Sequence, residues 1–441
     1  MWEYKDQDRH YTGVFNVEGD IINGEIIYNK GNGIILLVLE KEIIENYTLH
    51  KSYGNIRIIT GKLNTGASVT LFENRCVLNH EQVFQYQTLE FISQRMVFAH
   101  EDASDIAFNV IVCVLGNALS WGGLSPFQKT DDNSLKVVDE AQTVTFDWYG
   151  AKITFGPYLK NWFIVPKEEE NKIIQKLEVR IELDEKRTIE ELINIRDKII
   201  ALISFGIRDN VNVEEQYLIN RDKYIQHGEF RNYYKYYLFV NEPYLNLLKT
   251  NRWNFNFKLS QLNQSNDYSD ALSKLAPVFN LYMSLFRYSD MPAEMVFLNI
   301  IQAVETFHAR FYYDDKLSKY IEYVNSNYPD GSTINKLLLP NEQKKVKKIF
   351  LLSRINDLLI RAHSGSFNRF IIGKDRDFAS RVVISRNYYT HYDKSKEDKA
   401  LKGKDLYRAI NILRLLLEYS VCQVLGIDIN KRIQIELNDM E

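Results

Sequence analysis

The chain has 441 residues and a formal net charge of −3, which is long enough for two or three domains that each bury a core. Its three cysteines, Cys76, Cys113 and Cys422, are far apart, so neither a disulfide framework nor a zinc site is indicated and a reducing cytoplasm is expected. The first residues lack a signal-peptide pattern and no apolar run reaches about 18 residues, so we expect neither secretion nor a membrane span.

Residues 1 to about 165 contain short β-branched and aromatic runs that glycine and asparagine interrupt, such as GEIIYNKGNGIILLVLE. Such runs are typical of antiparallel strands joined by turns, and they predict a sandwich or barrel-like domain. The apolar run between Ala103 and Leu115 fits either a strand or a helix.

From about Lys167 to Leu275 strand-like runs accompany one helical run, TIEELINIRDKIIALISFG. Thr188 and Glu191 have the capping-box spacing at the start of this helix. We assign residues 1–275 to one β-rich N-terminal domain, with residue 165 as the candidate boundary between two subdomains.

Helical periodicity dominates beyond Asp270, and it predicts an all-α bundle over residues 276–430. The chain is therefore expected to be an α+β multidomain protein. The predicted helices include AEMVFLNIIQAVETFHARF, residues 341–365, Asp375–His391 and a run that begins near Asp405. A lysine-rich polar loop separates the last two.

Arg386 and His391, within SRNYYTHYD, supply the groups that RNA cleavage needs without a metal. An imidazole with an ordinary pKa of about 6.5 can take or give a proton, and a guanidinium can stabilise charge on phosphate oxygens. Five residues span about 140° on a helix, so the two side chains meet at one phosphate only if the helix ends or distorts near His391 or a second chain completes the site. We therefore expect a homodimer or a higher oligomer.

The spacing by itself is not specific, because it recurs at Arg75/His80 and at Arg95/His100. Both copies lie in strand-like sequence, where side chains five residues apart face opposite sides. Ordinary strand residues explain these two copies, and the helical context distinguishes the third.

The segment from about Met295 to Gly426 resembles a HEPN domain, an all-α ribonuclease module whose hallmark is an Arg followed after four to six residues by a His. Arg386, Asn387 and His391 match that hallmark, with Asn387 as the polar residue after the Arg. Glu305 matches an acidic position in the first HEPN helix. The whole chain is similar to the ApeA group of bacterial anti-phage proteins, which join a β-rich N-terminal domain to a HEPN domain.

This resemblance implies an endoribonuclease that needs no metal and no cofactor and cuts cellular RNA, with tRNA as a substrate, when phage infection is sensed. His391 would act as general base or acid, Arg386 would stabilise the transition state, and Asn387 would support them. Glu305 could orient either residue, although a surface salt bridge explains it equally well. Products would carry a 2′,3′-cyclic phosphate, and the N-terminal domain would bind a phage-derived trigger.

Charge is distributed unevenly along the chain. Residues 341–414 contain 18 lysines and arginines and 8 aspartates and glutamates, so this stretch is basic and the remainder is acidic. This asymmetry predicts RNA binding near the proposed site. The candidate RNA contacts are Lys344, Lys345, Lys347, Lys348, Lys394, Tyr389 and Tyr392, each of which a solvated or packing role also explains.

Two other histidines, His308 and His363, have weaker claims to a role, and for His308 a hydrogen-bonded core position is favoured. Walker A, zincin and nucleophile-elbow patterns are missing from the sequence. The alternative hypothesis is a non-catalytic HEPN module that dimerises and binds RNA, joined to an N-terminal domain that senses a ligand or a protein. A DNA nuclease is a weaker third possibility.

Overall fold

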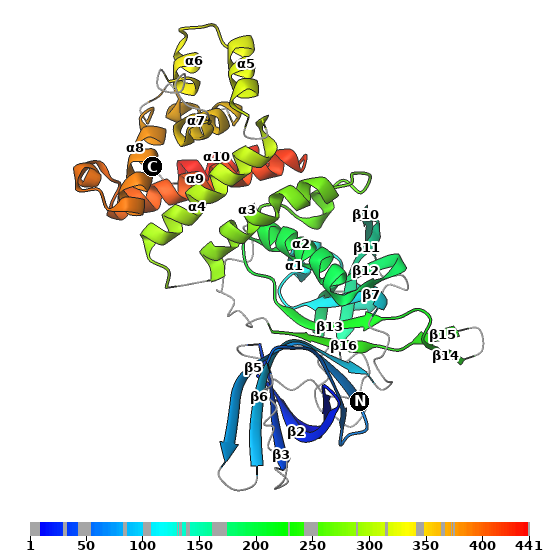
Figure 1. Ribbon diagram of the computed structural model, residues 1–441. Helices are drawn as coiled ribbons and strands as arrows, with labels where there is room; N and C mark the ends of the chain where they lie inside the picture. Colours follow the sequence, from blue (N-terminus) through cyan, green and yellow to red (C-terminus); the bar gives the residue numbers. More distant parts are fainter. Residues whose placement is uncertain are drawn as a thin grey trace. The chain divides into compact units, whose positions relative to one another are not determined.

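The computed structural model describes residues 9–29, 33–42, 54–82, 86–99, 107–129, 131, 135–137, 142–160, 174–227, 230–241, 255–287, 290–313, 316–340, 348–362, 367–371, 373 and 375–439. These residues belong to two compact units (Figure 1). The N-terminal unit comprises Met1–Leu119, Leu124–Arg196 and Asn212–Asn246, and the helical unit comprises Ser120–Gly123, Asp197–Val211 and Leu247–Glu441.

A closed antiparallel barrel of six strands forms the first part of the N-terminal unit. Its strands are β1 (Arg9–Val17), β2 (Asp20–Asn29), β3 (Ile34–Glu42), β4 (Ile56–Leu63), β5 (Ser68–Gln82) and β6 (Tyr86–Ala99). The barrel closes because β1 pairs with β2 and β4 while β6 pairs with β3 and β5. In β1, Phe15 and Val17 are buried and Val14 and Asn16 are exposed, which is the two-residue period of a strand with one face in a core.

The second part of this unit is a further antiparallel sheet that continues from the barrel, because β16 pairs with β6. In sheet order its strands are β10 (Val144–Trp148), β11 (Ala151–Lys160), β12 (Ile174–Thr188), β7 (Ala107–Leu115), β13 (Val213–Ile219) and β16 (Tyr236–Val240). Small hairpins β8 (Phe127–Lys129)–β9 (Leu135–Val137) and β14 (Tyr224–His227)–β15 (Phe230–Tyr233) complete the strand-rich region. The short helix α1 (Leu119–Gly122) follows β7, and its residues from Ser120 onwards belong to the helical unit. The run that ends at Leu115 is a strand buried on both faces, which explains its unbroken apolar sequence.

Helix α2 (Ile189–Ile207) follows β12 and begins with the predicted capping box. The Thr188 backbone N–H donates to Glu191 Oε2 at 3.0 Å, and the Glu191 N–H donates to Thr188 Oγ1 at 3.3 Å. The first half of α2 belongs to the N-terminal unit, where Arg196 donates to Gln216 Oε1 of β13 at 2.7 Å. Its second half belongs to the helical unit.

Helix α4 (Ala293–Phe311) is central to the helical unit, and it contacts α3, α7, α8 and α9 (Figure 1). The other helices are α3 (Ser269–Arg287), α5 (Leu317–Asn327), α6 (Thr333–Leu338), α7 (Leu351–Arg361), α8 (Phe378–His391), α9 (Gly403–Val424) and α10 (Asn430–Asn438), with 3₁₀ turns η1 (Leu259–Gln261), η4 (Asn368–Phe370) and η5 (Lys394–Lys399). Among the described residues, none of the helices combines the length and the apolar character that a bilayer crossing requires. The three cysteines are free thiols.

A buried cluster of charged side chains holds the end of α2 to α9 and α10 inside the helical unit. The Arg208 guanidinium donates to Glu436 through both terminal nitrogens, at 2.8 and 2.9 Å, and through Nε to Glu418 Oε1 at 3.2 Å. Glu418 is fully buried, and it also accepts from Tyr282 Oη at 2.6 Å and from Arg432 at 3.1 Å. Arg208 has a positive φ of 58°, an unusual conformation for a residue with a side chain, and these bonds offset its cost.

The predicted fold class, a β-rich barrel-like domain followed by a helical bundle, is confirmed. The helix predicted over AEMVFLNIIQAVETFHARF is α4, with the same bounds. Two predicted helix starts are wrong in the described residues, because α7 begins only at Leu351 and α8 only at Phe378. The predicted polar loop after His391 contains the 3₁₀ helix η5, which Asp393 caps by accepting the Ser395 N–H at 3.0 Å.

Candidate functional site

Helix α8 carries Arg386, Asn387 and His391. Its buried residues are Phe378, Ala379, Val382, Ser385 and Tyr389. The Tyr389 ring meets Phe297 of α4 edge-on, with 6.0 Å between the ring centres. Because one side of α8 is fixed by this packing, the three hallmark residues face away from the core: Arg386 and Asn387 are half-buried and His391 is exposed.

Helix α8 remains helical through His391 and ends there. Tyr392 follows in the left-handed conformation, with φ of 50°, and its N–H donates to the Tyr388 carbonyl. Arg386 Nη1 donates to Asn387 Oδ1 at 3.3 Å. Asn387 and His391 are four residues apart and share one stripe of the helix, whereas Arg386 and His391 are about 140° apart around it. Within the described residues no hydrogen bond joins Arg386 to His391.

The residues Lys394–Lys404, here called the basic segment, follow α8 directly. Asp393 caps its 3₁₀ helix and pairs with Lys396 at 2.9 Å. Hydrogen bonds from Lys396 and Ser395 lower the pKa of the Asp393 carboxyl to about 2, so it is ionised at neutral pH. Lys402 pairs with Glu397 at 3.5 Å, and its Nζ is 5.8 Å from the centre of the Tyr388 ring. The segment is therefore an ordered part of the helical unit.

The two tyrosines expected to contact RNA have different environments. Tyr389 is only 8% exposed, and its hydroxyl donates to the Leu401 carbonyl at 2.6 Å. Its ring is thus covered within the single chain, which disfavours stacking on a base, and the RNA contact at Tyr389 stays a prediction. Tyr392 is 67% exposed beside His391. The bond from Tyr389 to Leu401 could not be predicted from the sequence, because it joins the helix to a residue outside it.

His308 is a buried core histidine, as favoured from the sequence. Its Nε2 lies 2.9 Å from Asp357 Oδ2, and its Nδ1 lies 3.3 Å from an Arg354 nitrogen. Burial lowers the pKa of His308, and this effect outweighs the Asp357 carboxylate that would raise it. Glu305, one turn earlier on α4, is half-buried, and no hydrogen bond or ion pair within the described residues joins it to Arg386 or His391.

Most of the other basic and histidine candidates lie outside the described residues, namely Lys344, Lys345, Lys347, His100 and His363. Lys348 is exposed just before α7. Arg75 and His80 both lie in β5, and Arg95 lies in β6, where it pairs with Glu73 at 3.6 Å. The three described members of these two copies, Arg75, His80 and Arg95, thus lie in strands and not on a helix.

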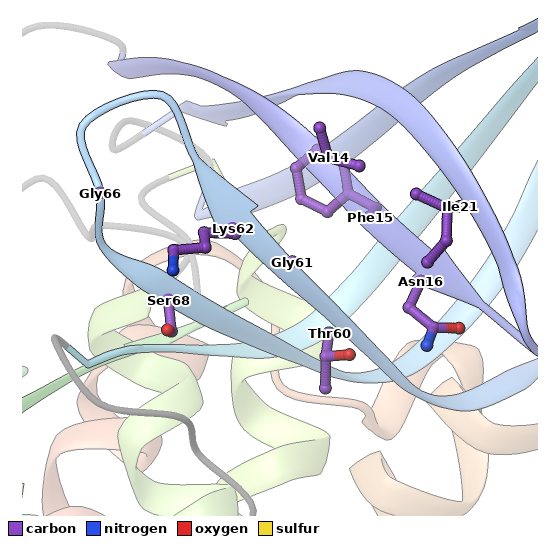
Figure 2. Close-up of a pocket in the computed structure, with 9 residues that line it drawn as sticks. All are labelled: Val14, Phe15, Asn16, Ile21, Thr60, Gly61, Lys62, Gly66 and Ser68. Atoms are coloured by element: carbon purple, nitrogen blue, oxygen red, sulfur yellow. The ribbon is translucent and has the colours of Figure 1, made fainter.

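A shallow pocket of about 380 Å³ opens on the outer face of the barrel (Figure 2). Val14 lies opposite Lys62 and Asn16 lies opposite Thr60 across the β1–β4 pair. These residues alternate with the inward-facing Phe15 and Gly61, where a Cβ on Gly61 would overlap the Phe15 ring. Ile21, 68% exposed, lies at the edge of the pocket, which therefore combines apolar side chains with one lysine.

Two protein-family models match the chain. Residues 10–268 match the ApeA N-terminal domain 1, and residues 298–431 match the Apea-like HEPN domain. Neither the curated proteins nor the solved structures gave a match. HEPN domains are generally ribonucleases, and they commonly dimerise and bind RNA, so the match over residues 298–431 suggests a defence-associated nuclease module. With both models covering most of its length in the same order, the chain belongs to the ApeA family of proteins with a C-terminal HEPN domain.

Proposed function

We propose that this protein is an endoribonuclease of anti-phage defence that cleaves cellular RNA, with tRNA as the substrate class, without a metal. The observation that carries the proposal is the position of Arg386, Asn387 and His391 on the solvent side of α8, directly beside the ordered basic segment. A proton-transfer group, a phosphate-binding guanidinium and a cationic surface are the components that such a reaction requires.

The proposed reaction is an internal transfer. The 2′-oxygen attacks the adjacent phosphorus, its proton goes to a base, and the bond from phosphorus to the 5′-oxygen breaks as that oxygen gains a proton. His391 acts as the base or the acid, and Arg386 stabilises the charge on the phosphorus oxygens in the transition state. Asn387, which accepts from Arg386, orients the guanidinium. The products carry a 2′,3′-cyclic phosphate and a 5′-hydroxyl.

A dimer or a higher homo-oligomer would complete this site. Because α8 stays helical through His391, the two side chains of one chain point in directions about 140° apart. In the proposed assembly, Arg386 of one chain acts on the same phosphate as His391 of the partner subunit. Glu305 is proposed to orient the pair only after assembly, since it makes no such bond within the described part of the single chain.

Mixing two inactive variants tests this arrangement. After subunit exchange, an equimolar mixture of Arg386→Ala and His391→Ala chains is expected to recover about a quarter of wild-type activity, because half of the dimers are mixed and each holds one intact site. The activity is measured as the rate of tRNA cleavage, with each variant alone as the control. If the mixture is no more active than the separate variants, the two residues do not act across subunits.

The product chemistry tests the reaction itself. Purified protein is incubated with total tRNA in EDTA, and in a parallel sample with extract from phage-infected cells, and the fragment ends are mapped. Cyclic-phosphate ends that form in EDTA are the expected result. Cleavage that EDTA abolishes, or 5′-phosphate ends, would contradict the proposed chemistry and favour a metal-dependent nuclease, including one that acts on DNA. A third sample contains Mg²⁺ and extract in place of EDTA, and absence of cleavage in all three samples would contradict nuclease function.

The pocket on the barrel favours the second candidate function, in which the N-terminal domain is a sensor and the HEPN domain only dimerises and binds RNA. Lys62 and the exposed Ile21 suit a partner protein that presents an apolar side chain next to a carboxylate, and a phage-derived protein in the cytoplasm is the proposed partner. In this candidate His391→Ala leaves defence against phage intact, whereas under the enzymatic proposal the same substitution removes it.

A further inference from the structure

Two side chains of α8 bind both polar backbone groups of Leu401. Ser385 Oγ accepts the Leu401 N–H at 2.8 Å, while its own hydroxyl donates to the Arg381 carbonyl one turn earlier at 2.7 Å. Tyr389 Oη donates to the Leu401 carbonyl at 2.6 Å. Ser385 and Tyr389 are four residues apart, on the buried stripe of α8, and Leu401 itself is 4% exposed.

This anchor fixes the basic segment near its C-terminal end, at Leu401. The segment is already fixed where η5 begins, because Asp393 caps that turn, and where α9 begins, at Gly403. Three fixed points within about ten residues leave the backbone little freedom, so the lysine positions are set relative to Arg386 and His391. The sequence predicted a loop here, and the structure has a docked element.

The lysines of the basic segment divide into two groups. Lys396 and Lys402 pair with Asp393 and Glu397. Lys394, Lys399 and Lys404 are exposed, and within the described part of the chain they have no carboxylate partner. A cation without a protein partner is available to a phosphate, and its binding of RNA releases condensed counterions.

We infer that Ser385 and Tyr389 are positioning residues, which hold the basic segment as a preorganised binding surface for the RNA phosphates that flank the cleaved one. This inference rests on the proposed ribonuclease function. When a lysine lies on a flexible loop, RNA binding must also order the loop backbone, and this costs conformational entropy. A lysine on a fixed backbone avoids that cost, so the anchor increases the affinity for RNA without touching it. Flanking phosphates keep their charge during the reaction, so the anchor acts on ground state and transition state alike.

Tyr389→Phe is the test variant, because it keeps the ring against Phe297 and removes only the hydroxyl. Tyr388→Phe is the matched control, since the Tyr388 hydroxyl makes no hydrogen bond within the described residues. Binding of a single-stranded RNA of about 20 nucleotides to the full-length protein is measured over a range of KCl concentrations. The logarithm of the affinity is plotted against the logarithm of the salt concentration, and each phosphate contact contributes about 0.7 to the slope. Hydrogen exchange of residues 394–404 and steady-state cleavage are measured on the same proteins.

We expect Tyr389→Phe to speed exchange in the basic segment, to weaken RNA binding and raise KM about ten-fold, and to leave kcat within about two-fold, since the lost binding is uniform. The salt slope should become shallower by about one contact or more. Ser385→Ala should act in the same direction, and Tyr388→Phe should match wild type. Faster exchange with unchanged RNA affinity and salt slope would overturn the inference, because the anchor would then be structural only.

The experiments distinguish failure of the proposed ribonuclease function from failure of the inference about the anchor. If the wild-type protein neither binds nor cleaves RNA, the function falls, although the exchange experiment still reports the Leu401 anchor. If Tyr389→Phe does not fold, the Lys399→Ala/Lys404→Ala double variant, which leaves the anchor in place, is used instead. Its salt slope should fall by about two contacts, and an unchanged slope would overturn the inference.

Discussion

RNA cleavage by the His391→Ala variant is expected to be about 10²–10⁴-fold slower than cleavage by the wild-type protein, which is the usual contribution of one positioned acid–base group. His391 is the last residue of α8, it is exposed, and its side chain makes no hydrogen bond within the described residues. Its removal therefore changes the free energy of unfolding by less than about 0.5 kcal/mol. Single-turnover cleavage of tRNA measures the rate, and the far-ultraviolet circular dichroism of each protein monitors the fold.

A control histidine outside the helical unit makes this result specific. His10 of β1 is exposed, and its Nδ1 lies 2.7 Å from Glu25 Oε1. His10→Ala should cleave at the wild-type rate. His308 is unsuitable as a control, because it is buried against Asp357 and its replacement would disturb the core. A His391→Ala rate within two-fold of the His10→Ala rate would remove His391 from the chemistry.

Local sequence patterns predicted the elements that local interactions determine. Thr188 and Glu191 are three residues apart, and their reciprocal hydrogen bonds form inside one turn, so the start of α2 could be read from spacing alone. The apolar stripe of α4 similarly predicted its full length. The β-branched and aromatic runs of the N-terminal region predicted antiparallel strands, although strand patterns cannot tell a sandwich from the closed barrel, which depends on the β1–β4 and β3–β6 pairings.

Contacts between distant residues were the ones that the sequence could not predict. Tyr389 was a reasonable RNA contact when only its neighbours in SRNYYTHYD were known. Its burial depends on Phe297, about ninety residues earlier, and its hydroxyl is taken by a backbone carbonyl, which carries no side-chain signal. Helix phase separates Tyr389 from His391, which comes two residues later, but not from Arg386. Ser385 lies four residues before Tyr389 on the same stripe, and that spacing is the signal that could have assigned Ser385 and Tyr389 to the core.

The cluster around Glu418 is a second long-range feature, and it joins regions that different family models match. Arg208 lies within residues 10–268 and Glu418 within residues 298–431, yet both belong to the helical unit. The end of α2 is thus part of the core of the HEPN-containing unit. A cut at the boundary between the two family matches would keep the Glu418 carboxylate but remove the Arg208 guanidinium that binds it.

Glu418→Gln is expected to lower the free energy of unfolding by about 3–5 kcal/mol, the usual cost of removing one partner from a buried ion pair. The substitution keeps the shape of the side chain and removes its charge, so Arg208, Arg414 and Arg432 lose their shared, fully buried counterion. Urea denaturation of the full-length protein, followed by the helical circular dichroism signal, measures the change. Glu397→Gln is the matched control, since its exposed pair with Lys402 contributes less than about 1 kcal/mol.

The pH dependence of stability separates the charge of Glu418 from its packing. Burial alone would raise the pKa of the Glu418 carboxyl, but Arg208, Arg414 and Arg432 together lower it below its ordinary value. The unfolded chain therefore takes up this proton at a higher pH than the folded chain does. The stabilisation is complete above the unfolded pKa of about 4.3, and it is lost as pH falls towards the folded pKa. Wild type should lose stability over that window, and Glu418→Gln should lose less, because glutamine binds no proton. Equal losses in both proteins would show that the destabilisation arises from packing and not from the buried charge.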